Sequence, residues 1–215
     1  MAWRAQKEIP VQERVKVFVA LSLCAWSVAL FAADAVVGSV VAARGDVYAD
    51  TAGGQPHPLA VNAPVHRGET IVTGRGKAKV ALIDGTILSI GENTRVQLSR
   101  FAGPEASANV RLNLISGVLR PLVTRTTATG SFEVETQTAI AAVRGTDWLM
   151  EAGAEKTSVA VLRGTVAVSN REDRGSRVLV TPGHGTDVVR GQPPTPPVPW
   201  GRPRLADLLL RATYD

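Results

Sequence analysis

Residues 77–87 read KAKVALIDGTI, and this stretch decides the fold. From Lys77 to Leu82 the larger apolar side chains occur at every second position, which is the pattern of a strand with one buried face. Asp84-Gly85 follows, and the next apolar run begins at Ile87. Because both turn residues tolerate a positive φ, the stretch predicts a β-hairpin.

The same period of two recurs through the body of the chain. No comparable helical period occurs before residue 200, and Gly, Pro, Asn or Asp marks turns at short intervals. The dipeptide Gly-Thr also recurs at spacings near multiples of 20, a weak indication of coil-by-coil repetition. We therefore predict an all-β fold, a multi-stranded sandwich, roll or solenoid-like domain over residues 36–190. The segments with the clearest alternation are 77–82, 95–99, 110–114, 132–135 and 165–169.

Two different patterns follow the predicted β domain. The proline-rich run QPPTPPVP at 192–199 predicts an extended linker over residues 191–200. Beyond it, Leu205, Leu208, Leu209 and Ala212 share one helical face, which predicts a short amphipathic helix in the tail at 201–215. So short a helix is marginal alone, and docking on its own domain is the simplest expectation.

The N-terminal 35 residues have the layout of a secretory signal peptide. A polar segment precedes the apolar run VFVALSLCAWSVALFAA at 17–33, and small residues at Ala33 and Ala35 predict cleavage after Ala35. This places the mature protein in the periplasm or outside the cell. The alternative is an inner-membrane anchor formed by residues 17–33, the only case that predicts contact with the membrane.

Composition narrows the function classes. The formal net charge of +5 is scattered along the predicted strands rather than gathered in a basic stripe, which argues against nucleic acid as a partner. The single cysteine, Cys24, lies in the leader, so the mature form is expected to contain no disulfide and no cysteine metal site.

No catalytic constellation is visible in the sequence. His57, His66 and His184 lie far apart in loop-like contexts and lack a second ligand at metal-binding spacing. Glu133 and Glu135 would share one face of a strand, a geometry open to acid and base chemistry but also produced by strand alternation alone. We therefore expect neither an enzyme nor a bound cofactor or metal.

Seven short blocks together resemble the FecR domain of iron-dicitrate-type sensor regulators. Their order and spacing are similar to that family from about Val40 to Val189. The blocks are GETIVT at 68–73, AKVAL at 78–82, DGT at 84–86, LISGV at 114–118, FEV at 132–134, AAVRGT at 141–146 and VLRGTV at 161–166.

The resemblance implies an all-β domain of the cell envelope that works through protein contacts. In some members such a domain passes a signal from an outer-membrane transporter to a sigma-factor system. We accordingly expect a non-catalytic module that binds an envelope protein in signalling or scaffolding. The alternative is an envelope structural or glycan-binding protein, in which exposed tryptophan or tyrosine would contact peptidoglycan.

The densest part of the family pattern supplies the candidate binding residues Arg144, Gly145, Thr146 and Trp148. A structural interpretation competes with binding there. Gly145 would provide a turn, and alternation would place Trp148 and Leu149 on opposite faces of a strand.

Overall fold

A computed structural model describes residues 35–51, 54–101, 109–124 and 131–214. Residues 34–215 form one compact unit. The predicted signal peptide lies outside the described residues except for Ala35, so the leader and its cleavage remain predictions. Within the described ranges, no helix is both long enough and apolar enough to cross a membrane.

The described chain is dominated by strands and ends in one helix, as the sequence predicts. The strands are β1 (Val36–Arg44), β2 (Val47–Asp50), β3 (His57–Pro58), β4 (Pro64–His66), β5 (Thr70–Thr73), β6 (Lys77–Leu82), β7 (Ile87–Ile90), β8 (Arg95–Phe101), β9 (Val110–Leu122), β10 (Phe132–Glu135), β11 (Ala139–Val143), β12 (Asp147–Ala152), β13 (Lys156–Arg163), β14 (Val166–Asn170), β15 (Arg177–Val180), β16 (His184–Val189) and β17 (Val198–Pro199), and the helix is α1 (Arg202–Ala212).

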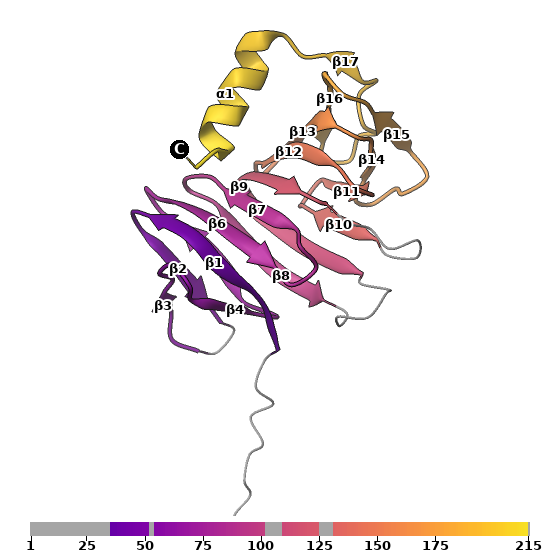
Figure 1. The fold of residues 1–215 in the computed structure, drawn as a ribbon. Helices are drawn as coiled ribbons and strands as arrows, with labels where there is room; N and C mark the ends of the chain where they lie inside the picture. Colours follow the sequence, from indigo (N-terminus) through magenta and orange to yellow (C-terminus); the bar gives the residue numbers. More distant parts are fainter. Residues whose placement is uncertain (1–34, 52–53, 102–108, 125–130, 215) are drawn as a thin grey trace, which may run out of the picture. The chain divides into compact units, whose positions relative to one another are not determined.

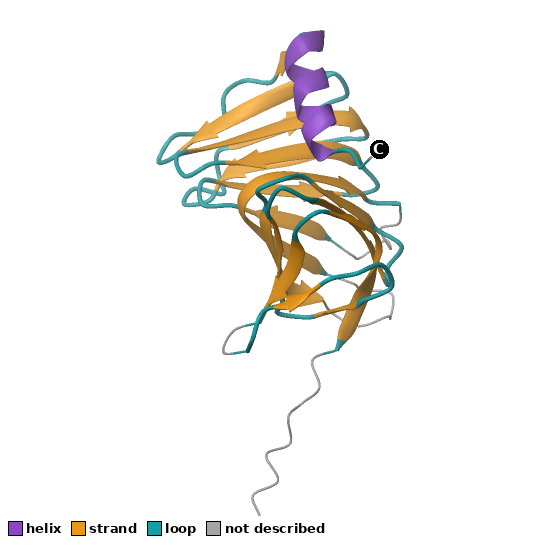
Figure 2. Ribbon diagram, turned by 90° about the vertical axis from the view of Figure 1, so that its left-hand side faces the viewer, coloured by secondary structure: helices purple, strands orange, loops and turns teal. Residues whose placement is uncertain are grey.

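The strands form one hydrogen-bonded network folded into two layers (Figures 1 and 2). Sheet A runs in the order β4-β1-β6-β7-β9-β12-β13-β16-β17. Sheet B runs in the order β3-β2-β5-β8-β9-β10-β11-β14-β15. Neighbouring strands are antiparallel except for β9 and β10. The apolar faces of both layers meet in a single core, in which Val80 and Ile71 are fully buried.

The long strand β9 belongs to both sheets. Its first half pairs with β8 and β10 in sheet B, and its second half pairs with β7 and β12 in sheet A. The change of sheet occurs near Gly117, where φ is +96° and a side chain would collide with Thr94. Only glycine meets both demands without strain.

Two bent hairpins flank β9. In the first, β6 pairs with β7 in sheet A while β5 pairs with β8 in sheet B, and β11 to β14 repeat this arrangement. Gly145 and Gly164, with φ of +59° and +88°, lie at facing corners of the second hairpin. Part of the Gly-Thr spacing therefore reflects the length of a hairpin rather than a stacked coil.

The hairpin predicted at 77–87 is confirmed. Strands β6 and β7 are antiparallel, and Gly85 adopts a φ of +85° in the turn between them. Ala78, Val80 and Leu82 are buried in the core, as the alternation predicts. Lys77 is also buried, because the C-terminal end of α1 covers it.

Helix α1 packs on sheet A (Figure 2). Leu208 and Ala212 are buried against Val118, Leu149 and other apolar residues. The Lys77 ammonium donates to the carbonyls of Leu210 (2.7 Å) and Thr213 (3.0 Å), at the helix end where unpaired carbonyls attract a cation.

The proline-rich segment contributes to this packing. Strand β17 pairs with β16, and the following Trp200 is buried with its ring against Gly185, where a Cβ would collide with the indole. The guanidinium of Arg204 lies 3.5 Å from the centre of the Trp200 ring. The segment thus lies against the domain rather than extending away from it.

Candidate binding surface

The outer face of sheet B carries a row of directly paired residues. Cross-strand register places Arg111, Glu133, Ala142, Ala167 and Leu179 side by side on β9, β10, β11, β14 and β15. The row is charged at the β9 end and apolar at the β15 end. Because strand alternation sends every second side chain outward, the inward neighbours build the core while this row faces away from it.

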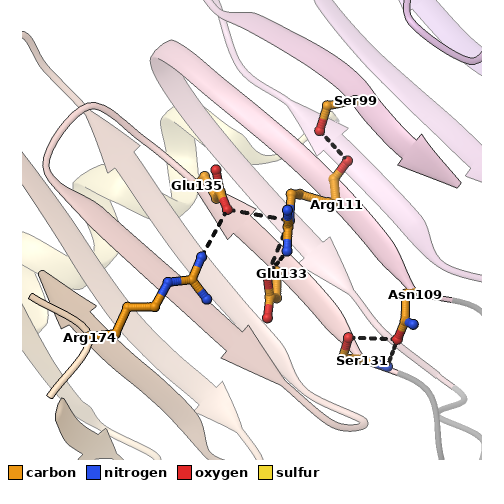
Figure 3. Close-up of polar contacts among 7 residues, drawn as sticks. All are labelled: Ser99, Asn109, Arg111, Ser131, Glu133, Glu135 and Arg174. Atoms are coloured by element: carbon orange, nitrogen blue, oxygen red, sulfur yellow. Dashed lines mark hydrogen bonds and ion pairs between the residues drawn. The ribbon is translucent and has the colours of Figure 1, made fainter. Parts of the chain in front are cut away.

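An ion-pair network occupies the charged half (Figure 3). Arg111 donates from Nη2 and Nε to Glu133 Oε2, at 2.9 and 3.2 Å, and its Nε lies 3.3 Å from Glu135 Oε1. Arg174 Nη2 approaches the same Glu135 oxygen at 3.4 Å. The two carboxylates therefore share a face, as predicted, but both are ion-paired with arginine. The arrangement ties β10 to β9 and to the loop before β15, and it leaves neither carboxylate positioned as a free acid or base.

An open hollow of about 500 Å³, which we call the sheet-B groove, covers the apolar half. Its lining includes Ala142 and Ala167, whose small side chains leave room above the sheet. Leu179 lines it from β15 with 60% of its surface exposed. The remaining lining residues include Ser131, Arg144, Gly164 and Thr165.

The four candidate residues at 144–148 separate in the structure. Arg144 is exposed and lines the sheet-B groove, where its guanidinium has no hydrogen-bond or ion-pair partner among the described residues. Thr146 is buried and its hydroxyl donates to the carbonyls of Arg144 (3.2 Å) and Thr165 (3.3 Å). Trp148 is fully buried in the core between the sheets, whereas Leu149 faces α1. Arg144 is the member of the set whose side chain is available to a partner.

Asp147, within the same stretch, is held by Arg120. Two parallel hydrogen bonds of 2.9 Å join the guanidinium to both carboxylate oxygens. The hydrogen bond to Asp147 raises the pKa of Arg120, and burial opposes this rise. This bidentate pair links β9 to β12 and orients the strand that carries Trp148.

A second polar cluster joins α1 to sheet A. Asp187 accepts hydrogen bonds from Ser158 Oγ (2.6 Å) and Arg204 Nη2 (2.7 Å). Burial raises the pKa of Asp187, but these two hydrogen bonds and the arginine charge outweigh it, so the pKa is lowered overall. The cluster fastens the helix and has no unpaired acid to offer a substrate.

Sequence reasoning missed one histidine arrangement. Glu69 is buried, and its Oε1 lies 3.1 Å from His66 Nδ1 and 3.8 Å from His57 Nε2. The i, i+3 spacing of His66 and Glu69 was a local signal for their contact, but the approach of His57 depends on the pairing of β2 with β3. Across the part of the chain that the structure describes, no group of three His, Cys, Asp or Glu side chains is arranged to hold a metal ion.

Comparisons with known proteins agree with this architecture. The model of the family described as FecR protein matches residues 69–167, the stretch from the start of β5 into β14. Comparison with curated proteins gives no match.

Two crystal structures of a protein from Parabacteroides distasonis ATCC 8503, described as a "putative anti-sigma factor", share the fold. Each has a TM-score of 0.52 and 20% sequence identity, and the match covers 64% of this chain. It spans 62% of the neighbour's length, so the neighbour extends well beyond the shared part. The family-model match at residues 69–167 takes in the first bent hairpin, β9 and the second bent hairpin as far as the start of β14, so this region of the chain is similar to the FecR protein family.

Proposed function

We propose that this chain is an exported, non-catalytic regulatory module that binds a protein partner in the cell envelope through the sheet-B groove. The observation that carries the proposal is that an exposed Arg144, without a side-chain partner among the described residues, and a largely exposed Leu179 line one groove of a FecR-like domain. Arginine is enriched among the residues that dominate protein interfaces. Contiguous exposed apolar surface often marks a site of protein interaction.

The form of the groove favours a macromolecule over a small ligand. Small-molecule sites enclose most of their ligand, with convergent polar groups that fix its orientation. The sheet-B groove is instead an open hollow on a sheet face, with two alanines and one arginine in its lining. An open, partly apolar groove with one arginine in its lining suits a protein segment.

The comparison with solved structures is consistent with a regulatory role. The neighbour from Parabacteroides distasonis is described as a "putative anti-sigma factor", a name that denotes a regulator of a sigma factor. At 20% identity this likeness supports the fold, and the step to signalling in the present chain belongs to the proposal.

Site-specific crosslinking in cells tests the proposal. A photoreactive residue at Ala167 in the groove is expected to trap a discrete protein adduct, whereas one at Lys79 on sheet A is not. Arg144→Glu is expected to abolish the adduct, and Arg75→Glu, which changes an exposed arginine at the corresponding corner of the first hairpin, is expected to retain it. Equal adducts from Ala167 and Lys79, or an adduct indifferent to Arg144→Glu, would contradict a binding role for the groove.

The glycan-binding alternative has one observation in its favour. Trp148 and Trp200, the tryptophans that the structure describes, are buried and offer no stacking platform. Tyr48, however, lines an open hollow of about 570 Å³ together with His57 and Pro56. If this alternative holds, the protein sediments with peptidoglycan and Tyr48→Ala abolishes the sedimentation.

A further inference from the structure

Within the described residues the two sheets end in four edge strands, and three of these are poorly suited to pair with a further strand. Strand β3 consists of His57–Pro58, β4 begins at Pro64, and β17 is Val198–Pro199. None exceeds three residues, and each contains a proline, which has no backbone N–H to donate to another strand. Short, proline-bearing edges are a common protection against unwanted pairing.

Strand β15, Arg177–Val180, lacks this protection. It has four residues, contains no proline, and among the described strands pairs with β14 alone. No other segment of the described chain forms hydrogen bonds with its far side. Outward-facing Leu179 is 60% exposed, so this edge presents both free backbone groups and an apolar side chain. An edge with these properties is a template for a further strand.

We propose that β15 is a strand-addition site for an extended, acidic segment of a partner protein. The proposal rests on the proposed function, because it names the kind of segment that reaches the sheet-B groove. A strand beside β15 would place alternate side chains on the outer face of sheet B, next to Leu179 and the groove that it lines. The intervening side chains would cover Val178, which is only partly buried at present.

Arg177 defines the charge of the added segment. Its side chain is exposed, shares the outer face with Leu179, and has no hydrogen-bond or ion-pair partner among the described residues. Opposite charges directly across two strands stabilise their pairing and like charges destabilise it. The matching segment therefore carries an apolar residue beside Leu179 and an aspartate or glutamate beside Arg177. We expect antiparallel pairing, which is slightly more stable per residue than parallel pairing.

A second copy of this chain fits the edge less well. Two β15 strands paired antiparallel about Val178 would place each Arg177 opposite a Leu179, which leaves both guanidinium groups without an acidic partner. The charge therefore favours a different, acidic partner over self-association.

Synthetic peptides and the purified full chain in detergent test the proposal. The probe is a fluorescent peptide of about ten residues that alternates inward valines with an outward leucine and, two residues later, an outward glutamate. Replacing that glutamate by lysine is expected to weaken binding about fivefold, and Arg177→Glu in the protein is expected to reverse the preference. Fluorescence anisotropy measures each affinity.

Backbone methylation distinguishes strand pairing from simple charge attraction. Methylating the backbone amides of the peptide that face β15 is expected to weaken its binding at least about tenfold, because two or more hydrogen bonds between the peptide and β15 are lost. Methylating the other set is expected to leave the affinity within about twofold. Equal effects of the two sets, or failure of the unmethylated peptide to bind, would overturn strand addition.

Two further outcomes separate this inference from the proposed function. If the peptide fails while the crosslink at Ala167 persists and still depends on Arg144, protein binding at the groove stands and only strand addition falls. If the full chain forms a dimer that excludes the peptide and is weakened by changing Leu179, a second copy occupies the edge and the acidic partner is ruled out.

Discussion

Replacing Trp148 by alanine is expected to lower the free energy of unfolding by about 3 to 5 kcal/mol. The indole is fully buried among core side chains of both sheets, so its removal loses transfer energy and leaves a cavity. Total stabilities of domains are about 5 to 15 kcal/mol, so the substitution is expected to remove about a fifth or more of the stability. For a domain of this size the melting temperature is expected to fall by roughly 6 to 20 °C.

Thermal unfolding followed by far-ultraviolet circular dichroism measures this shift. Arg144→Ala is the control, because an exposed arginine without a partner changes stability by no more than about 0.5 kcal/mol. Trp148→Phe is expected to lose less stability than Trp148→Ala, because phenylalanine keeps an aromatic ring in the core. The substitution also eliminates the indole Nε1 donor, which has no partner among the described residues. If Trp148→Ala has the same melting temperature as the wild type, the structural interpretation of residues 144–148 is refuted.

Four other predictions follow from the sequence and the packing. Gly145→Val is expected to destabilise the fold by about 1 to 2 kcal/mol, because φ there is +59°, whereas Gly153→Ala, with ordinary geometry, is expected to be close to neutral in the same melts. Lys77→Met is expected to remove two charge-assisted hydrogen bonds and to speed hydrogen exchange in α1, and unchanged exchange would show that the lysine does not hold the helix. The pKa of Asp187 is lowered in the folded state from its ordinary value of 3.8. The ionised carboxylate therefore stabilises the fold above pH 3.8, and this stabilisation is lost as the pH falls through the lower pKa of the folded state. Asp187→Asn is expected to remove that part of the acid sensitivity in melts at different pH values. N-terminal sequencing of the protein from the cell envelope is expected to start after Ala35, and an intact Met1 with alkali-resistant membrane association would replace cleavage by the anchor.

The all-β fold could be predicted because the alternation of apolar and polar residues is a local property of the sequence. The burial of Ala78, Val80 and Leu82 follows from the period of two, and the turn at Gly85 follows from the Asp-Gly dipeptide. The path of β9 was not predictable, because nothing local to Gly117 states that the strands before and after it lie in different sheets. Long-range packing decides which strands pair with one another, and a period of two in the sequence does not indicate these partners.

The candidate binding surface shows the same division between local and long-range information. Alternation correctly placed Glu133 and Glu135 on one face, but their pairing with Arg111 depends on a parallel register between β9 and β10. The sheet-B groove needs Ala142 and Leu179, which are distant in sequence, to occupy the same row. Of the candidate residues at 144–148, Arg144 lines the groove. Gly145 forms a turn, and Thr146 and Trp148 are buried, so these three residues serve the fold.

The shared strand β9 also constrains the order in which the molecule can acquire its structure. Each bent hairpin is local and can close early, whereas β7 and β8 of the first hairpin both wait for β9 as their neighbour. A nascent chain that ends before residue 110 therefore exposes two unpaired strand edges at once, one in each layer. Synthesis of residues 110–122 covers both edges, but the far side of β9 then waits for β10 in sheet B and for β12 in sheet A, so the unpaired edges move along the chain until the second hairpin is complete.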